Sequence, residues 1–344
     1  MKKTKAGAPQ ILPGGRLIRL CTLVSLCASF LACLSIPPQP RPRDYVGVGE
    51  DFSGELAHAH SQALRGLGPR LPGSASDRIA RAYLAREFRR NGAKPRELAG
   101  GASTHLIAEN RGRSRDVILL VAAYPVLGSG DWVDDTGAGV LLELARAFES
   151  TSQPYTLGFA LAETRPSRAT TEAGIIPTPS PGEEDLTALW EPVTGQWAAR
   201  RLVVEAGREL AIAIEAAGEP DRIRAIIVLD LSGHRDLRIV RDLRSHPGFR
   251  KIFWRSAARL GQDSIFPSHE DWDAPGSLHL GFQERSMNRI LALVDIAPRE
   301  HELAVSAPTR SRSPRSDLEA FGRVVVEALG TLMRRFEKVD AFSK

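Results

Sequence analysis

Short apolar runs alternate with helical patterns along this chain. Three runs are almost free of polar residues, at 117–123, 157–162 and 226–229. Runs of this length are typical of strands that are buried on both faces of a sheet. Apolar residues recur at helical spacing in four other segments, at 80–88, 141–148, 202–217 and 318–329. Strands that alternate with helices predict an α/β fold, a three-layer sandwich whose mostly parallel central sheet is flanked by helices.

Two of the predicted helices have recognisable ends. Ser76 is the expected N-cap of the first, and Asn91-Gly92 ends it. The last helix is expected to begin near Ser313-Pro314 and to fade near Phe336.

One segment inside the predicted domain has no apolar period. Residues 165–183 read RPSRATTEAGIIPTPSPGE and are rich in turn formers. This composition is typical of disordered loops. We therefore expect a disordered insertion directly after the second predicted strand, in a domain that spans residues 51–340.

The N-terminus has the pattern of an export signal. Residues 1–32 contain five basic residues and no acidic one, and they end in the apolar run Leu20–Ala32. A transmembrane helix is the alternative, but thirteen residues are too few to cross about 30 Å of hydrocarbon. We therefore expect residues 1–32 to be a signal peptide.

The leader ends in a sequence that predicts lipid attachment. Phe30-Leu31-Ala32-Cys33 resembles a bacterial lipobox, in which the cysteine carries the lipid, and the proline-rich residues 33–50 would form an extended tether. The three cysteines of the chain are Cys21, Cys27 and Cys33, so the domain itself can form no disulfide. We expect a protein of the bacterial cell envelope that is held at the membrane by its N-terminal lipid and faces the periplasm or the exterior.

The net charge of +5 depends on the leader. Five of the 46 Lys and Arg residues lie in residues 1–32, which leaves 41 against 41 Asp and Glu residues in the rest of the chain. A nearly neutral protein lacks the basic surface that nucleic acid requires, so we expect no nucleic-acid partner.

Candidate chemistry lies where the predicted strands end, because ligands of open α/β sheets bind at the carboxyl ends of the strands. Those positions hold Ala123-Tyr124-Pro125, Glu163-Thr164 and Asp230, with Asp134-Asp135 leading into the next helix. Acidic residues that converge at one edge suggest metal binding or general-base chemistry.

Five segments in order give the chain a family resemblance. They are GPRLPGS at 68–74, DDTGAGVLLELARAF at 134–148, FALAE at 159–163, IIVLDLSG at 226–233 and SPRSDLEAFGRVVVEAL at 313–329. Together they resemble the co-catalytic zinc aminopeptidases and their glutaminyl cyclase relatives. The resemblance covers nearly all of the domain apart from the insertion.

The resemblance implies a role for each acidic position. In that family two zinc ions share a bridging aspartate and a water that becomes the nucleophile. Asp135 matches the bridge, with Asp134 as the alternative register. Asp230 matches a second aspartate ligand, Glu163 the general base, and His301 lies near the place of a C-terminal histidine ligand.

Three departures weaken the implied metal site. Where the family has His-Tyr-Asp, this chain has Ala123-Tyr124-Pro125, and where the family has Glu-Glu, it has Glu163-Thr164. Each zinc thus loses one protein ligand, and Pro125 removes the carboxylate that orients the lost histidine. We expect zinc to bind weakly or not at all.

Structural roles are the alternative for each of these residues. Asp134 or Asp135 could cap the helix that follows, Glu163 could be solvated in a loop, and Asp230 could close a turn through Ser232-Gly233. His279, in SLHLGF, lies in a stretch that resembles a family segment near the active site, but the favoured interpretation is a neutral histidine packed under a loop. His105, His234 and His269 are possible substitute ligands.

These observations leave three functions open. The loss of one ligand from each zinc, together with the orienting carboxylate, favours a pseudo-peptidase that retains the pocket and binds a peptide or protein. An active aminopeptidase or glutaminyl cyclase-like enzyme would need a substitute ligand. A domain that only packs against an envelope partner is the third possibility, because fold alone does not determine function.

Overall fold

The computed structural model describes residues 51–125, 135–149, 151–165, 196–231, 236–269, 271–274, 276–295 and 314–342, with the backbone alone at 196–200. The expected signal peptide, tether and lipidated Cys33 lie outside these residues, as do Asp134, His301 and nearly all of the expected insertion. No helix among the described residues is long and apolar enough to span a membrane.

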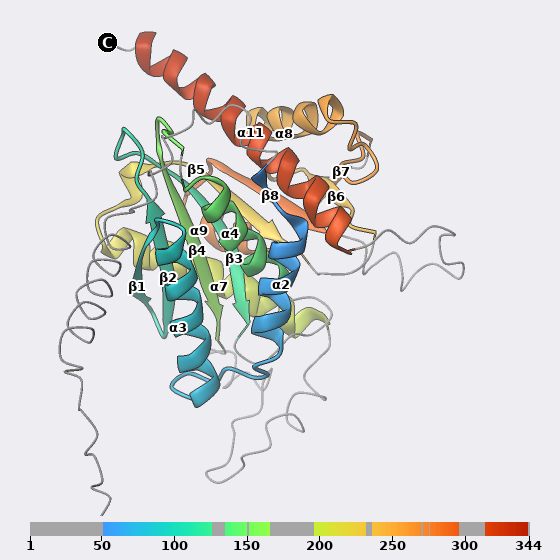
Figure 1. The fold of residues 1–344 in the computed structure, drawn as a ribbon. Helices are drawn as coiled ribbons and strands as arrows, with labels where there is room; N and C mark the ends of the chain where they lie inside the picture. Colours follow the sequence, from blue (N-terminus) through green and yellow to red (C-terminus); the bar gives the residue numbers. More distant parts are fainter. Residues whose placement is uncertain are drawn as a thin grey trace, which may run out of the picture. The chain divides into compact units, whose positions relative to one another are not determined.

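Eight strands form one mixed sheet in the order β1-β2-β4-β3-β5-β8-β6-β7 (Figure 1). The four central strands β4, β3, β5 and β8 are parallel, whereas β1, β2 and β6 run antiparallel to their inner neighbours. The strands are β1 Lys94–Gly100, β2 Ser103–Asn110, β3 Val117–Pro125, β4 Thr156–Thr164, β5 Ile223–Asp230, β6 Ile239–Asp242, β7 Asp271–Trp272 and β8 Ile290–Asp295.

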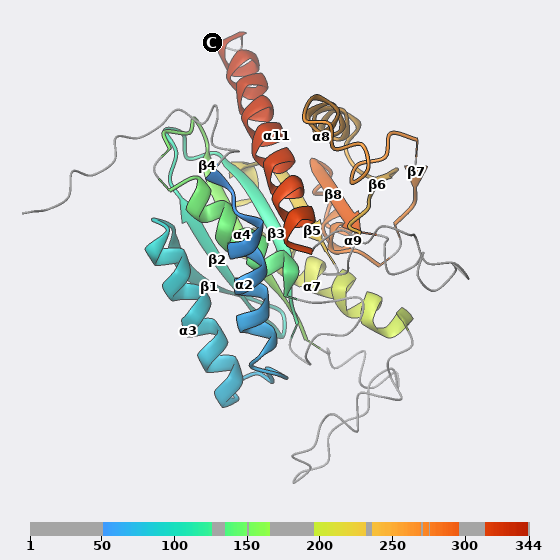
Figure 2. The same ribbon diagram turned by 45° about the vertical axis from the view of Figure 1, so that its right-hand side comes forward.

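Helices cover both faces of the sheet, as Figure 1 and Figure 2 show. One face carries α2 Gly54–Arg65, α3 Ala75–Arg90, α4 Thr136–Ala147, α8 Pro247–Arg259 and α11 Pro314–Phe342. The other face carries α7 Gln196–Ala216 and α9 Leu278–Glu284, and the 3₁₀ turn η2 Pro220–Arg222 precedes β5. The predicted α/β fold with a mostly parallel central sheet between helical layers is therefore confirmed.

Strand β3 shows why the central strands are continuous apolar runs. Ile118, Leu120 and Ala122 pack into the core beneath α2, α3, α4 and α11. Val117 and Leu119 alternate with them and pack beneath α7 and α9. Because successive side chains point to opposite faces, a strand covered on both sides has no position for a polar residue before its end.

The three predicted strands correspond to β3, β4 and β5, each longer than its apolar run; β5 begins three residues before the run 226–229 and ends one residue after it. The N-cap of α3 is Ser74 rather than Ser76, since the Ser74 hydroxyl accepts a hydrogen bond from the Asp77 amide. The last helix begins at Pro314, as predicted, but extends to Phe342.

Helix α4 approaches α2 closely at Gly139. A Cβ atom at this position would overlap the Ala57 carbonyl oxygen and the Ser61 hydroxyl of α2. Only glycine permits this contact. The contact matters for the site because Asp135 is the N-cap residue of α4, so the packing of α4 on α2 fixes where that carboxylate lies.

We expect Gly139→Ala to lower the free energy of unfolding by about 1–3 kcal/mol, because overpacking outweighs the gain in helix propensity. Gly66→Ala is the matched control, since a Cβ there meets only ordinary van der Waals contacts, at 3.4 and 3.6 Å. Urea unfolding of both variants measures the difference. Equal stability of the two variants would contradict the packing argument.

Candidate functional site

The carboxyl ends of β3 and β4 lie side by side. Their parallel register pairs Tyr124 with Glu163 and Pro125 with Thr164. On the other side of β3, the last paired residues are Val121 and Val228, so Asp230 lies near the level of Ala123. The fold thus brings the candidate residues at the ends of β3, β4 and β5 to one edge of the sheet.

The candidate residues at the strand ends lie on opposite faces of the sheet. Tyr124 follows Ala122 in the layer beneath α3 and α4, and Glu163 is its partner in the register. Ala123 packs with the layer beneath α7. Strand alternation assigns Thr164 and Asp230 to this second side as well. The expected base therefore faces α3, away from the positions of the lost ligands.

Asp135 forms a buried ion pair with Arg70. Its Oδ1 lies 2.8 Å from one terminal guanidinium nitrogen and its Oδ2 3.1 Å from the other, and both side chains are at most 1% exposed. Arg70 also donates to the carbonyls of Pro125 and Leu64. Burial raises the pKa of Asp135, and the pair with Arg70 opposes this shift. Both oxygens of the expected bridging carboxylate are thus engaged by an arginine, while the alternative register, Asp134, lies outside the described residues.

Glu163 is buried and held at both its backbone and its side chain. Its Oε2 accepts a 2.6 Å hydrogen bond from the Thr104 amide and lies 3.1 Å from Nη2 of Arg81. Its own amide donates to Nδ1 of His105 at 3.1 Å. Burial raises the pKa of Glu163, whereas the Thr104 amide and Arg81 lower it.

The contacts of Glu163 with Thr104 and His105 hold β2 and β4 together beyond the point where their backbone pairing ends. The antiparallel ladder stops at Leu106 and Leu161. Beyond that point the Glu163 carboxylate and the His105 ring take the hydrogen bonds that backbone groups would otherwise take. Burial and the nearby Arg81 charge lower the pKa of His105 to about 4, so this ring is neutral near pH 7.

Tyr124 joins the contacts of Asp135 and Glu163 into one network. Its hydroxyl donates to Asp77 Oδ1 at 3.0 Å. Two guanidinium groups lie over its ring, with Cζ of Arg70 at 5.1 Å and Cζ of Arg81 at 5.3 Å from the ring centroid. Cations at such distances are attracted by the ring face.

The three positions that depart from the family pattern supply no metal ligand. Ala123 has no donor atom, and Pro125 contributes its carbonyl oxygen to Arg70. The Thr164 hydroxyl donates to the Tyr124 carbonyl at 3.2 Å. No group of three or more His, Cys, Asp or Glu residues in the described parts of the chain could hold a metal ion. The described side of the site therefore does not fit a pair of co-catalytic zinc ions.

Asp230 ends β5 and is half-buried. The structure thus places it at the expected edge without showing it beside Asp135 or Glu163. His279 is fully buried, with Nε2 3.5 Å from Oδ2 of Asp242 on β6, and burial lowers its pKa. This supports the packed neutral histidine that was one of its two interpretations. His234 lies outside the described residues.

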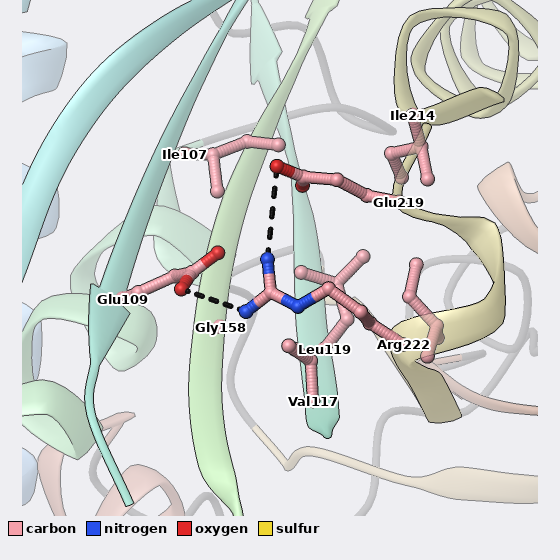
Figure 3. Close-up of a pocket in the computed structure, with 9 residues that line it drawn as sticks. Ile107, Glu109, Val117, Leu119, Gly158, Ile214, Glu219 and Arg222 are labelled. Carbon is pink, nitrogen blue, oxygen red and sulfur yellow. Dashed lines mark hydrogen bonds and ion pairs between the residues drawn. The ribbon is translucent and has the colours of Figure 1, made fainter. Parts of the chain in front are cut away.

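A separate hollow opens near the amino ends of the strands. It lies between β2, β3, β4 and the end of α7, and Val117 and Leu119 form part of its wall. Figure 3 shows Arg222 at this hollow between Glu109 and Glu219. Its Nη2 lies 3.2 Å from Oε2 of Glu109, and its Nη1 lies 3.7 Å from Oε1 of Glu219. None of the candidate site residues lines the hollow, so it is not part of the site at the strand ends.

Sequence reasoning missed Arg81 and Asp77, which hold Glu163 and Tyr124. Asp77 and Arg81 are four residues apart on α3, a spacing that predicts a helical ion pair. The spacing alone could not show that this pair is turned inward onto the sheet. Arg70 lies within the segment GPRLPGS, yet nothing in that segment names its partner.

No protein-family profile matches the chain, and no curated protein sequence matches it significantly. Solved structures do match its fold. Glutaminyl cyclase from Porphyromonas gingivalis aligns with a TM-score of 0.58 at 21% identity, over 81% of this chain and 98% of that one. A leucine aminopeptidase precursor from Bacteroides thetaiotaomicron gives 0.60 at 16%, over 81% and 97%. A Zn-dependent exopeptidase from Parabacteroides distasonis gives 0.56 at 17%, over 80% and 97%.

The chain therefore has the fold of bacterial glutaminyl cyclases and zinc-dependent exopeptidases over about four-fifths of its length. This confirms the fold that the five sequence segments indicated. Identities of this size show the fold alone, so the chemistry has to be argued from the site itself.

We expect His105 to make the folded state less stable in mild acid. Its pKa is about 4 when folded against 6.5 unfolded, so protons bind the unfolded chain first. The folded state therefore has its full stability with respect to His105 above pH 6.5, and it loses stability as the pH falls from 6.5 towards 4. Between about pH 7.5 and pH 5 this loss amounts to about 2 kcal/mol. Urea unfolding at the two pH values measures it.

His105→Asn is the control for this prediction, because the amide oxygen can still accept from the Glu163 amide but does not titrate. The variant should lose about 2 kcal/mol less than the original chain on acidification. An equal loss in both proteins would assign the acid sensitivity to other groups.

Proposed function

We propose that this chain is a pseudo-peptidase, an exported lipoprotein of the bacterial envelope whose zinc-peptidase-like domain binds a peptide or protein without cleaving it. The observation that carries this proposal is the environment of Glu163. The residue that matches the general base is held by Arg81 and by the Thr104 amide.

A general base must be free to take a proton from the attacking water. The Glu163 carboxylate already accepts two charge-stabilising contacts and is 1% exposed. Burial raises the pKa of Glu163, and the Thr104 amide and Arg81 act against this shift. Both contacts are made by Oε2, so they join the side chain to β2 and α3 and withdraw that oxygen from proton transfer.

Ligand arithmetic supports the same proposal. Catalytic zinc takes three protein ligands and a water. Ala123 and Thr164 stand where the family has a histidine and a glutamate, and Asp135 is paired with Arg70. A metal would have to break the buried Arg70 pair or use ligands from elsewhere.

A ligand would bind at the carboxyl ends of β3, β4 and β5, because open α/β sheets present their binding crevice there. Loss of the metal leaves this geometry in place. Attachment to the envelope rests on the basic leader, the apolar run and the Ala32-Cys33 sequence. It would keep such a binding domain at the membrane.

We expect the purified chain to carry at most about one weakly held zinc and to release no N-terminal residue from aminoacyl substrates. It should also leave N-terminal glutamine uncyclised, with or without added zinc. Metal analysis and the two activity assays test this. Tightly bound zinc together with turnover would show that the chain is an enzyme with a substitute ligand.

Glu163→Gln separates the two functions. In a pseudo-peptidase it changes no activity but lowers the free energy of unfolding by about 1 kcal/mol, because Arg81 loses a charged partner. In an active enzyme it would abolish turnover, since the amide cannot act as a base. Turnover and urea unfolding of the same preparation distinguish these results.

For attachment to the envelope, we expect Cys33→Ser to release the protein from the membrane fraction or to stall cleavage of the leader. Fractionation of cells and the mobility of the protein on a gel measure both. Cys27→Ser, within the leader, is the matched control and should leave attachment unchanged. Unaltered attachment and cleavage in the Cys33 variant would refute the lipid anchor.

A further inference from the structure

The last turns of α11 extend beyond the elements on which this helix packs. Phe336 is its last buried residue, and the helix continues from there to Phe342. Both ribbon views show this end of α11 extending past α8 and the neighbouring strands (Figures 1 and 2). Lys338, Val339, Ala341 and Phe342 are exposed. The packing of the domain core therefore does not explain the side chains at this end of the helix.

One face of these turns combines apolar and basic side chains. Arg335, Lys338, Val339 and Phe342 follow one another at steps of three, one and three residues, which places them on one face of a helix. Val339 is 51% exposed and Phe342 is 91% exposed. An exposed helix face that joins apolar residues to Lys and Arg is typical of helices that lie on a membrane surface.

Further positive charge lies beside this face. Arg289 is exposed, and its Cζ lies 5.4 Å from the centroid of the Phe336 ring. Burial lowers the pKa of His246, the N-cap residue of α8, and the charges of Arg289 and Arg335 lower it further. Arg289 and Arg335 therefore both lie close to His246, although they come from different elements.

The acidic residues of the same turns do not neutralise this face. Glu337 and Asp340 come two and five residues after Arg335, which places them on the opposite side of the helix. There Glu337 pairs with Arg113 at 2.8 Å, and Asp340 pairs with Arg224 at 2.8 Å. The face that carries Phe342 consequently keeps its positive charge.

We propose that the α11 tip, residues 335–342, docks with Arg289 on a membrane surface that contains anionic lipids. Phe342 and Val339 enter the headgroup region, while Arg335, Lys338 and Arg289 lie against lipid phosphates. This inference rests on the proposed function, because it assumes a chain that is anchored to the envelope, and it adds an orientation of the domain at the membrane. A second copy of this chain is the poorer partner, because like charges would meet.

The expected lipid anchor can reach the same membrane. The Phe52 ring packs against α11 at Gly322. From Gly322 to Phe342 the helix rises by about 30 Å, at about 1.5 Å per residue. A chain as long as residues 33–51 spans at most about 60 Å. Lipid on Cys33 and the α11 tip can therefore contact one bilayer at the same time.

The tip alone is a weak and reversible membrane contact, and stable attachment needs the lipid as well. The test therefore uses the processed chain, residues 33–344, with Cys33→Ser, which carries no lipid and keeps every described residue. Co-sedimentation measures its binding to vesicles of phosphatidylcholine, alone or mixed in equal parts with phosphatidylglycerol. We expect at least about tenfold tighter binding to the mixed vesicles at low salt, and loss of this preference at about 1 M salt.

Variants of the tip locate the binding surface. Arg335→Gln combined with Lys338→Gln should weaken binding to the mixed vesicles at least about tenfold, because each cation near an anionic surface contributes several-fold. Phe342→Ser should weaken it about fivefold or more, because the ring no longer enters the headgroup region. These side chains are exposed, so the circular dichroism spectrum should be unchanged.

Matched controls lie on α3, away from the α11 tip in both ribbon views. Arg78→Gln combined with Arg89→Gln removes two exposed cations, and Ile79→Ser removes an apolar side chain that is 55% exposed. Each should change binding less than about twofold, because these residues do not face the bilayer when the tip is docked.

The outcomes are distinct from those of the proposed function. Equal binding to both kinds of vesicle, or binding that the tip variants do not weaken, overturns this inference and leaves the lipid anchor and the pseudo-peptidase untouched. A concentration-dependent dimer that Phe342→Ser abolishes, seen by analytical ultracentrifugation, would assign the face to a second copy and would also overturn it. The anchor is tested separately by Cys33→Ser in cells, and the pseudo-peptidase by metal analysis and turnover.

Discussion

Burial of the four central parallel strands on both faces is the constraint on which the rest of this domain depends. Each of these strands can carry polar side chains only where it emerges from the helical layers. Such a sheet needs a layer of helices on each face. The packing of those helices includes the tight contact of α4 with α2 at Gly139 and the cap of α3 at Ser74, and it places Asp135 at the start of α4. The edge at which the strands end is consequently where charge and chemistry collect.

Two buried carboxylates at that edge, Asp135 and Glu163, form ion pairs with arginines of the same chain. Arg70 and Arg81 enter from one side of the sheet and lie over the Tyr124 ring, and each pairs with a buried carboxylate. Removing either cation would leave a buried carboxylate without its positively charged partner, which is costly. In a metal enzyme the same edge would be incomplete until the metal binds. Among the described residues of this edge, Asp135 and Glu163 are paired by arginines of the same chain.

The sequence predicted the layers well and the site only in part. Unbroken runs such as 117–123 and 157–162 predicted β3 and β4, because burial on both faces favours an apolar run. The outer strands β1 and β2 were missed, since KPRELAG and STHLIAEN mix polar and apolar residues. The strands β6, β7 and β8 were missed as well, although the central strand β8 reads ILALVD and is almost wholly apolar. The edge that holds Glu163 and Asp230 was predicted from strand ends. Their partners were not, because Arg81 is brought to Glu163 by the docking of α3, and docking leaves no local pattern.

The junction of β2 and β4 bears on how a glutamate at the place of a catalytic base is interpreted. Across it the Glu163 carboxylate accepts from the Thr104 amide and the Glu163 amide donates to the His105 ring, in place of backbone pairing. A glutamate that holds two strands together in this way is retained by selection for a stable fold, whether or not it takes part in a reaction. A glutamate at this position in a sequence is then uninformative about catalysis. The neighbours that decide whether its carboxylate is free carry the information instead.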